Sequence, residues 1–446
     1  MTQEHGLSGA SPPFSRALMQ RGLKSASWIA LTFISKFLGM TREFALLAVI
    51  GIGATLDNFL FFLNGPVLIV TLVGGLIYTS LTPILAKREQ TDAGMIGRSI
   101  LADSIRMGAA LTGVALTLNL ALYGVLLQYD ELPHNSLLIA VACPLAVFFT
   151  VIAEHFSAWL TAHGRTGYIV SGNILISLPP VFALVFLPID ITSYTVIFIV
   201  SFFLRSVWLM FGMRDRLLDI RLVPGDFRRR LMLMNSADRH LLAGAPMLVL
   251  QVVLFLPILL ARAFEETSVS LYFYALKAPQ FYLTTVWFVL GVQFFKGLQT
   301  LNLLQAQRAL SILVRINAAI IMVIGLAVYG LSVIPFDRIL PARWLEQIAF
   351  VDLLSLWLFA LPIALFASLT DGLQKYFATF QLRPGSRRLA VVLTLIAVPA
   401  LIAAMVWGSV EALLLAALVT TGCGSLIGWA LLMRQTRTEK LEPRDR

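Results

Sequence analysis

The chain has 446 residues, of which 58% are hydrophobic and only 13% are charged, and its mean hydropathy is +0.84. Soluble globular domains carry about 25% charged residues, so this composition excludes a soluble protein of this length and indicates an integral membrane protein. We expect membrane topology and contacts with anionic lipid headgroups to account for the formal net charge of +10. We therefore expect no nucleic-acid partner.

Apolar runs of about 20 residues, the length at which a helix crosses a bilayer, recur along the chain between charged or Pro- and Gly-containing breaks. They predict an all-α polytopic membrane protein with about twelve transmembrane helices. The expected spans are residues 27–50, 58–84, 104–127, 137–161, 167–188, 193–213, 241–262, 269–296, 309–334, 347–370, 388–407 and 410–433.

The longest polar connection, residues 214–240, is basic and leaves six predicted helices before it and six after it. We therefore expect two six-helix lobes around a central cavity, formed by residues 25–213 and 241–434 and joined by this cytoplasmic linker. Residues 1–24 and 435–446 are expected to form a cytoplasmic N-terminal segment and a cytoplasmic tail.

The two halves share a short pattern early in the second helix of each. NGPVLIVTLVGG (64–75) and KAPQFYLTTVWF (277–288) each combine a polar residue with a proline two positions later and a threonine seven positions later. Internal repeats with a substrate site at the repeat interface are common in secondary transporters. The pattern therefore favours a transporter whose site lies between the lobes.

Lysine and arginine are concentrated in alternate connections. AKREQTDAGMIGR (86–98) and KYFATFQLRPGSRR (375–388) are basic, whereas QYDELPHNS (128–136) on the other side holds neither lysine nor arginine. The positive-inside rule then places both termini in the cytoplasm, and we expect a bacterial inner-membrane protein. The N-terminal sequence lacks a short apolar core before a small-residue cleavage site, so we expect no cleavable signal peptide.

The connections carry no recognisable catalytic machinery. They lack the GxxxxGK[ST], GxSxG and HExxH motifs, and the outer connections are too short to hold a catalytic domain. We therefore expect a transporter and not an enzyme, with no cofactor. Cys143 and Cys423 lie in apolar runs without CxxC or Cys/His spacing, so we expect neither a disulfide nor a metal site.

The first predicted helix carries charge in its apolar middle, in the run SKFLGMTRE (35–43). Each Lys or Arg at a helix centre costs roughly 2.5–3.5 kcal/mol to insert. In one interpretation Lys36 pairs with Glu43 or with a carboxylate across the bundle, while Arg42 extends towards the interface. In the other, Lys36 and Arg42 line a water-filled cavity and bind an anionic group, to which an ammonium and a guanidinium in low dielectric are well suited; a phosphate or diphosphate fits.

Other ionisable residues also fall within predicted spans: Glu154, His155, Arg205, Asp352 and Asp371. Adjacent residues on a helix point about 100° apart, so Glu154 and His155 cannot both face one ligand. Glu154, Asp352 and Asp371 are candidates for coupling to protons or sodium. A carboxylate neutralised by a neighbouring helix is the alternative for Glu154. The membrane potential is a further candidate driving force.

Four stretches match the motifs of one transporter family. SKFLGMTRE (35–43) is similar to S-R-x-x-G-x-x-R-[DE], and GIGATLDNFLFFLNGP (51–66) is similar to a glycine-rich turn followed by A-T-D-x-F. TSVSLYFYALK (267–277) resembles G-S-V-S-x-x-Y-Y-A-D-R-L, and KYFATFQLR (375–383) resembles F-Y-A-x-x-D-x-K. These motifs are those of the MurJ/MviN lipid II flippases of the MOP exporter superfamily, which the chain resembles over about residues 25–390.

The resemblance implies a substrate site. By it, Lys36 and Arg42 stand in the places of two cavity arginines, Asp57 in that of an acidic residue, and Lys277 in that of an arginine of the eighth helix. Asn64 stands where the family has a lysine. In the family such groups engage a diphosphate-sugar headgroup while the prenyl tail stays in lipid. We therefore expect Lys36, Arg42 and Lys277 to converge on one polar cavity, with Asp57 and Asn64 also in the substrate site.

The chain departs from the family at Asn64, at Leu276 in place of an aspartate, and in lacking two further helices. The expected function is a flippase that moves an undecaprenyl-diphosphate-linked glycan, lipid II-like or an exopolysaccharide unit, from the inner to the outer leaflet by alternating access, as a monomer. One alternative is a MATE-like cation or drug antiporter, for which a carboxylate-lined cavity is expected. A non-transporting member of the family is the other alternative.

Overall fold

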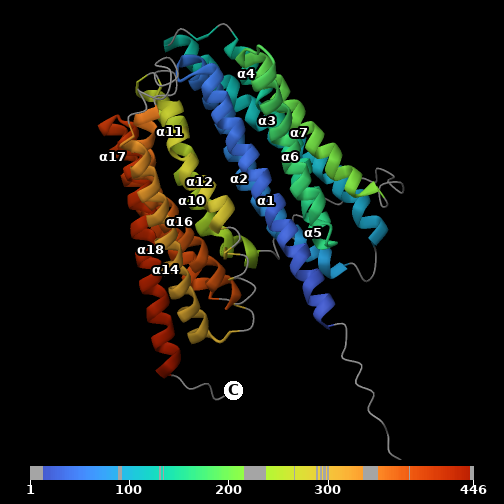
Figure 1. Ribbon diagram of the computed structural model, residues 1–446, viewed down its shortest axis with the longest axis vertical. Helices are drawn as coiled ribbons and strands as arrows, with labels where there is room; N and C mark the ends of the chain where they lie inside the picture. The colour runs from blue at the N-terminus through green and yellow to red at the C-terminus, as the bar shows by residue number, and fades with distance from the viewer. Residues whose placement is uncertain are drawn as a thin grey trace, which may run out of the picture.

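The structure is a computed structural model in which helices account for nearly all described residues (Figure 1). It describes residues 14–88, 93–129, 132–133, 135–214, 238–265, 267–287, 290–291, 294, 298, 301–334, 350–380 and 382–441. No strand occurs among these residues, and the predicted all-α fold is confirmed. The predicted N-terminal segment before residue 14, most of the predicted linker (215–237) and the end of the tail (442–446) lie outside the described residues.

The N-terminal lobe consists of helices that follow the predicted spans closely. They are α1 (Phe14–Ile50), α2 (Ala54–Arg88), α3 (Ala93–Tyr129), α4 (Ser136–Ala142), α5 (Leu145–Ala162), α6 (Thr166–Phe186) and α7 (Ile191–Gly212). Helices α2 and α3 pack against α5, and α6 packs against both α1 and α7. The fourth predicted span is divided into α4 and α5 at Pro144, which lacks the amide hydrogen needed to continue a helix.

The C-terminal lobe begins after the basic linker. Its elements are α10 (Asp238–Leu260), a short 3-10 turn η1 (Ala261–Ala263), α11 (Ser268–Ala275), α12 (Lys277–Tyr282), a π-helical turn η2 (Leu283–Trp287), α14 (Leu303–Ser332), α16 (Phe350–Thr379), α17 (Arg383–Trp407) and α18 (Val410–Leu441). Helices α16 and α17 pack against α18, α10 packs against α17, and α14 packs against α16. Up to residue 287, where the continuous description ends, the eighth predicted span is thus divided into α11, α12 and η2.

Several helices extend beyond the predicted spans. Helix α1 begins at Phe14, not at residue 27, and α18 continues to Leu441, past the expected end at 433. The predictions were too short there because hydropathy detects only the part of a helix that suits the hydrocarbon core.

Ten helical segments of the described chain are long and apolar enough to cross a membrane, which makes this a multi-pass membrane protein. Two of the twelve predicted spans are not among the ten. One is α1, whose described part carries Lys36, Arg42 and Glu43, and the other is the broken segment that carries Lys277. The charged side chains make these two segments less suited to lipid than the ten.

The two lobes meet at one end of the molecule and diverge towards the other, where α1 begins and α18 ends (Figure 1). Contacts between the lobes run mainly from α2 to α10 and α11. The largest buried apolar cluster spans both lobes, with Leu46 and Phe59 from the N-terminal lobe and Tyr272 and Leu413 from the C-terminal lobe. The closed end is thus held by a shared core, as the prediction of two lobes around a central cavity requires.

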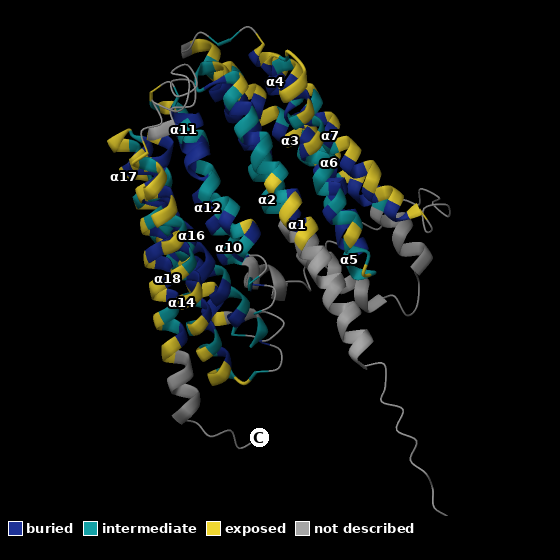
Figure 2. Cartoon of the chain, in the orientation of Figure 1, coloured by how far each residue is buried: buried dark blue, intermediate teal, exposed yellow. Residues whose placement is uncertain are grey.

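Large apolar side chains cover much of the outer surface of both lobes (Figure 2). On α17, for example, Leu395 is 68% exposed and Val406 is 84% exposed. An apolar surface of this extent is unfavourable in water and suits the hydrocarbon of a bilayer.

The cap of α7 provides a test of stability outside the membrane. Asp190 accepts a hydrogen bond from the backbone amide of Ser193 (3.0 Å), and hydrogen bonds from Ser193 hold the pKa of this exposed carboxyl below its usual range. Loss of an N-cap side chain costs about 0.5–2 kcal/mol, so Asp190→Ala should lower the thermal midpoint in detergent at pH 7.

Because the pKa of Asp190 is lower in the folded state, its stabilising effect is present above the unfolded-state pKa and is lost as the pH falls through the folded-state pKa. The difference in midpoint between wild type and Asp190→Ala should therefore shrink on acidification below the normal aspartate range. Asp190→Asn, which caps without titrating, is the matched control. If the difference in thermal midpoint between wild type and Asp190→Ala stays constant over this pH range, the assignment of Asp190 as the N-cap of α7 is contradicted.

Candidate functional site

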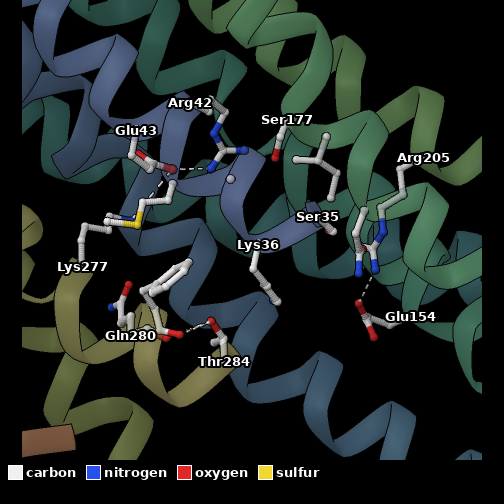
Figure 3. Close-up of a pocket in the computed structure, with 15 residues that line it drawn as sticks. Ser35, Lys36, Arg42, Glu43, Glu154, Ser177, Arg205, Lys277, Gln280 and Thr284 are labelled. Atoms are coloured by element: carbon white, nitrogen blue, oxygen red, sulfur yellow. Dashed lines mark hydrogen bonds and ion pairs between the residues drawn. The ribbon is translucent and has the colours of Figure 1, made fainter. Parts of the chain in front are cut away.

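A cavity of about 450 Å³ lies between the lobes (Figure 3). Helices α1, α5, α6 and α7 form one wall, and α12 with the π-helical turn η2 forms the other. The charged residues in this lining are Lys36, Arg42, Arg205, Lys277, Glu43 and Glu154. The lining, called the central cavity below, therefore carries a formal excess of two positive charges.

The first group of charges, the Glu43 cluster, consists of Arg42, Glu43 and Lys277. Glu43 forms an ion pair with the neighbouring Arg42, and its Oε1 lies 3.9 Å from Nζ of Lys277 (Figure 3). Each cation also lies over an aromatic ring, with Arg42 4.9 Å from the centre of Phe198 and Lys277 3.6 Å from that of Phe273. One carboxylate and two rings thus hold two cations from different lobes close together.

The backbone around this cluster is fixed by two further hydrogen bonds. The hydroxyl of Tyr274 donates to the carbonyl of Glu43 (3.0 Å), and Nε1 of Trp357 donates to the carbonyl of Tyr274 (2.8 Å). Helix α11 ends one residue after Tyr274, and α12 begins at Lys277. The break therefore presents Lys277 to the cavity while Tyr274 binds α1.

The second group, the Glu154 cluster, consists of Lys36, Glu154 and Arg205 on α1, α5 and α7. Nη2 of Arg205 lies 3.1 Å from Oε1 of Glu154, and Lys36 lines the same cavity and is directed towards Glu154 (Figure 3). Within the described chain, Lys36 has no ion pair within 4 Å. Gly74 of α2 makes room here, because a Cβ atom at that position would lie 3.1 Å from Cγ of Glu154.

Uncharged polar side chains occupy the cavity wall near the two clusters. Asn173 and Ser177 come from α6, Gln280 from α12 and Thr284 from η2. A π-helical turn shifts the side chains that follow it around the helix axis and is often found at functional sites. Amides and hydroxyls of this kind can donate to and accept from a neutral polar ligand such as a sugar.

The structure brings together four of the predicted site residues: Lys36, Arg42, Lys277 and Glu154 all line the central cavity. The suggested pairing of Lys36 with Glu43 is wrong, because Glu43 binds Arg42 and Lys277 instead. Seven residues of helix separate positions 36 and 43 by about 10 Å, beyond the reach of neighbouring turns.

The remaining predicted residues lie outside the lining. Asn64 is buried in α2, where its Nδ2 donates to the carbonyl of Leu60 (2.6 Å). Asp371 accepts hydrogen bonds from Nε1 of Trp287 (2.7 Å) and from Nζ of Lys375 (2.5 Å) within the C-terminal lobe. Asp352 lies in a separate pocket at the closed end. No group of three or more metal-ligating side chains occurs among the described residues.

Asp57 joins the lobes instead of facing the cavity. Its carboxylate accepts from the backbone amides of Val269 (3.3 Å) and Ser270 (2.9 Å), and the Ser270 hydroxyl also donates to it. Thr267, the residue before α11, has φ 84° and does not cap the helix with its own side chain. Asp57 of one lobe therefore caps a helix of the other, with its charge at the positive end of the helix.

Arg205 is a charged cavity residue that the sequence prediction did not assign to the site. The sequence could have identified Arg205, because an arginine in the middle of an apolar helix needs a polar partner. The sequence distinguishes the uncharged cavity residues less well, since single amides and hydroxyls are common in membrane helices; these residues are Asn173, Ser177, Gln280 and Thr284. His155 is not part of the cavity lining, and its Nδ1 lies 2.8 Å from the carbonyl oxygen of Val151, in agreement with the 100° separation from Glu154.

Comparison with solved structures places this arrangement among known folds. The inward-facing conformation of a multidrug resistance MATE family transporter of the MOP superfamily matches over 92% of this chain and 96% of its own, with a TM-score of 0.68 and 14% identity. This chain shares the fold of that transporter. The inward closed conformation of lipid II flippase MurJ matches over 92% of this chain and 87% of its own, with a TM-score of 0.66 and 14% identity.

A third structure is a MOP superfamily transporter from Pyrococcus furiosus, described as having a binding pocket of reverse polarity that suggests a different function. It covers 93% of this chain and 96% of its own, with a TM-score of 0.61 and 14% identity. No protein-family model matches the chain, and no curated protein matches it. The similarity is thus one of fold, and the chemistry of the cavity has to be argued from this chain's own residues.

The Asp57 contact can be tested by removing it. Hydrogen bonds to charged groups contribute about 1.5–3 kcal/mol, and about 1.4 kcal/mol corresponds to a tenfold change in an equilibrium constant. Asp57→Ala should therefore increase the population of molecules whose lobes are separated at the closed end at least about tenfold. Spin labels at the exposed Asn135 and Glu411 report this separation by pulsed electron paramagnetic resonance, after Cys423 is replaced by serine.

Asp57→Asn is the matched comparison for this experiment, since it retains one acceptor for the amides of α11 and should shift the distances less. An unchanged distance distribution in Asp57→Ala contradicts a role in holding the lobes together.

Proposed function

We propose that this protein is an alternating-access transporter that moves an undecaprenyl-diphosphate-linked glycan between the leaflets of a membrane. The single observation that carries this proposal is the central cavity, in which four cations outnumber two carboxylates and come from both lobes. A diphosphate is an anionic prenyl-linked group, which an excess of cations favours. Arg and Lys side chains in a low-dielectric site bind such a group strongly.

The shape of the protein supports transport. The lobes share a buried core and the Asp57 contact at one end, and they diverge towards the other end. A cavity between two such bodies can open to the opposite side if the contacts at the closed end are exchanged for contacts at the open end. We place both termini, and so the open end, in the cytoplasm of a bacterial inner membrane, which makes the inner leaflet the side of loading.

The position of α1 supports a lipid-linked substrate. One face of α1 contributes Ser35 and Lys36 to the cavity, while neighbouring apolar side chains are exposed on its surface: Leu31, Phe33, Ile34 and Phe37. Phe33 packs edge-on against Phe281 of α12, with ring centres 6.5 Å apart. A headgroup in the cavity therefore lies one helix away from hydrocarbon, where a prenyl chain can remain.

The structural relatives leave two substrate classes to compare. One relative is named as a lipid II flippase and another as a multidrug resistance transporter. An organic cation in the central cavity would face four cations and only two carboxylates, both of which are already paired with arginine. The charge of the cavity thus favours the anionic lipid, either lipid II-like or an exopolysaccharide unit.

Transport can be tested in vesicles that contain the purified full-length protein and an undecaprenyl-diphosphate glycan. The rate at which the sugar becomes inaccessible to a membrane-impermeant reagent is measured. Arg42→Gln and Lys277→Gln should each lower this rate about tenfold or more, because each removes a charge-assisted hydrogen bond to the diphosphate. Arg308→Gln, which removes an exposed cation of α14 outside the cavity, is the control and should leave the rate unchanged.

A second pair of variants separates the effect of the cavity's net charge from the effect of losing the arginine side chain. Glu43→Gln raises the net charge of the cavity by one, and the double variant Arg42→Gln/Glu43→Gln restores it while removing the arginine. Retained transport in the Arg42→Gln and Lys277→Gln variants, or uptake of organic cations in place of the lipid, rejects the proposed substrate.

Of the three predicted coupling carboxylates, we propose Glu154, since it lines the central cavity and Asp352 and Asp371 do not. If protons or sodium drive transport through Glu154, the rate in wild-type vesicles should rise with an imposed gradient of that ion, and Glu154→Gln should remove the rise. A response to membrane potential alone, equal in wild type and Glu154→Gln, assigns the driving force to the charge of the substrate instead.

A further inference from the structure

We propose that the central cavity contains two separate anion subsites, and that the substrate carries a second acidic group on its glycan in addition to the diphosphate. This inference rests on the proposed function and narrows its substrate class. The Glu43 cluster is one subsite and the Glu154 cluster is the other (Figure 3).

The two clusters are distinct in space and in charge. Lys36 and Arg42 are six residues apart on α1, which separates them by about 9 Å along the helix. Nη2 of Arg205 lies 3.1 Å from Oε1 of Glu154, whereas Arg42 and Lys277 both form ion pairs with Glu43. Figure 3 shows Lys36 directed away from Glu43 and towards Glu154. Each cluster therefore acts as its own electrostatic unit.

The clusters are also built alike. Each has two cations and one carboxylate, so each retains a formal excess of one positive charge. In each, the arginine forms an ion pair through Nη2, and its buried Nε has no hydrogen-bond partner among the described residues, both for Arg42 and for Arg205. A buried donor without a partner costs about 1–3 kcal/mol, and an anionic ligand oxygen removes that cost. Each cluster is thus prepared for one acidic group.

One diphosphate cannot occupy both subsites. Its two phosphoryl groups share a bridging oxygen and lie together, so they fit within a single cluster. We assign the diphosphate to the Glu43 cluster because only there do cations from both lobes meet. The Glu154 cluster lies wholly within the N-terminal lobe and remains for an acidic group further along the headgroup.

The wall near both clusters suits the sugar that connects two such groups. Gln280 and Thr284 face the cavity from the C-terminal lobe, and Asn173 and Ser177 face it from α6. Nε2 of Gln280 is buried without a hydrogen-bond partner in the described part of the chain. An acidic sugar, such as a uronic acid close to the diphosphate, offers hydroxyls to these side chains and a carboxylate to Lys36 and Arg205.

Two lipids that differ at one carbon test this inference: undecaprenyl-diphosphate-glucose and undecaprenyl-diphosphate-glucuronic acid. Their equilibrium binding to the purified full-length protein in detergent is measured by competition against a fluorescent undecaprenyl-diphosphate. The wild-type protein should bind the acidic lipid about tenfold or more tightly than the neutral one, as expected for a charge-assisted contact. This ratio needs no variant and so does not depend on any variant folding.

Variants then show which residues cause the preference for the acidic lipid. Lys36→Gln should bring the ratio of the two affinities close to one, whereas Lys277→Gln should weaken binding of both lipids and keep the ratio. Arg308→Gln, outside the cavity, should change neither affinity. A ratio that persists in Lys36→Gln overturns the assignment of the second subsite.

The outcomes separate the two proposals. Equal binding of both lipids by the wild-type protein rejects the second subsite while leaving a lipid-diphosphate transporter intact. If the fluorescent undecaprenyl-diphosphate does not bind and neither glycan lipid binds, the proposed function is rejected and this inference with it.

Discussion

The carboxylate of Glu43 makes it possible for two cations from different lobes to face each other inside a membrane protein. Arg42 is adjacent to it on α1, and Lys277 approaches it from α12. Without that carboxylate, the repulsion between Arg42 and Lys277 in a low dielectric would oppose the contact between α1 and α12. The approach of α1 to α12 at the central cavity therefore depends on this carboxylate.

The closed end combines two kinds of interaction that differ in how they can be reversed. The apolar core formed by α1, α2, α10 and α11 is non-directional, so it tolerates small shifts of the lobes. The contact of Asp57 with Ser270 is directional and is lost over a short movement. Together they stabilise the closed state, in which the contact between Asp57 and Ser270 is the one that a small separation of the lobes breaks.

The sequence predicted the fold well and the site in part. Ten of the twelve spans expected from hydropathy are helical segments long and apolar enough to cross a membrane. The cost of intramembrane charge pointed to Lys36 and Arg42, and the family resemblance pointed to Lys277. The sequence could not pair Glu43 or place Asp57, because the partner of Asp57 lies more than 200 residues away in the other lobe and its identity depends on packing. A capping aspartate and a ligand-binding aspartate also look the same in a sequence, since both are buried acids near a helix end.

The division of the eighth span into short pieces has a geometric consequence. Helix α11 has only eight residues. Asp57 of the other lobe binds the first turn of α11, and Lys277 of the cavity follows its last turn after one intervening residue. A contact between the lobes and a charged group of the cavity therefore lie at opposite ends of one short helix, about 12 Å long.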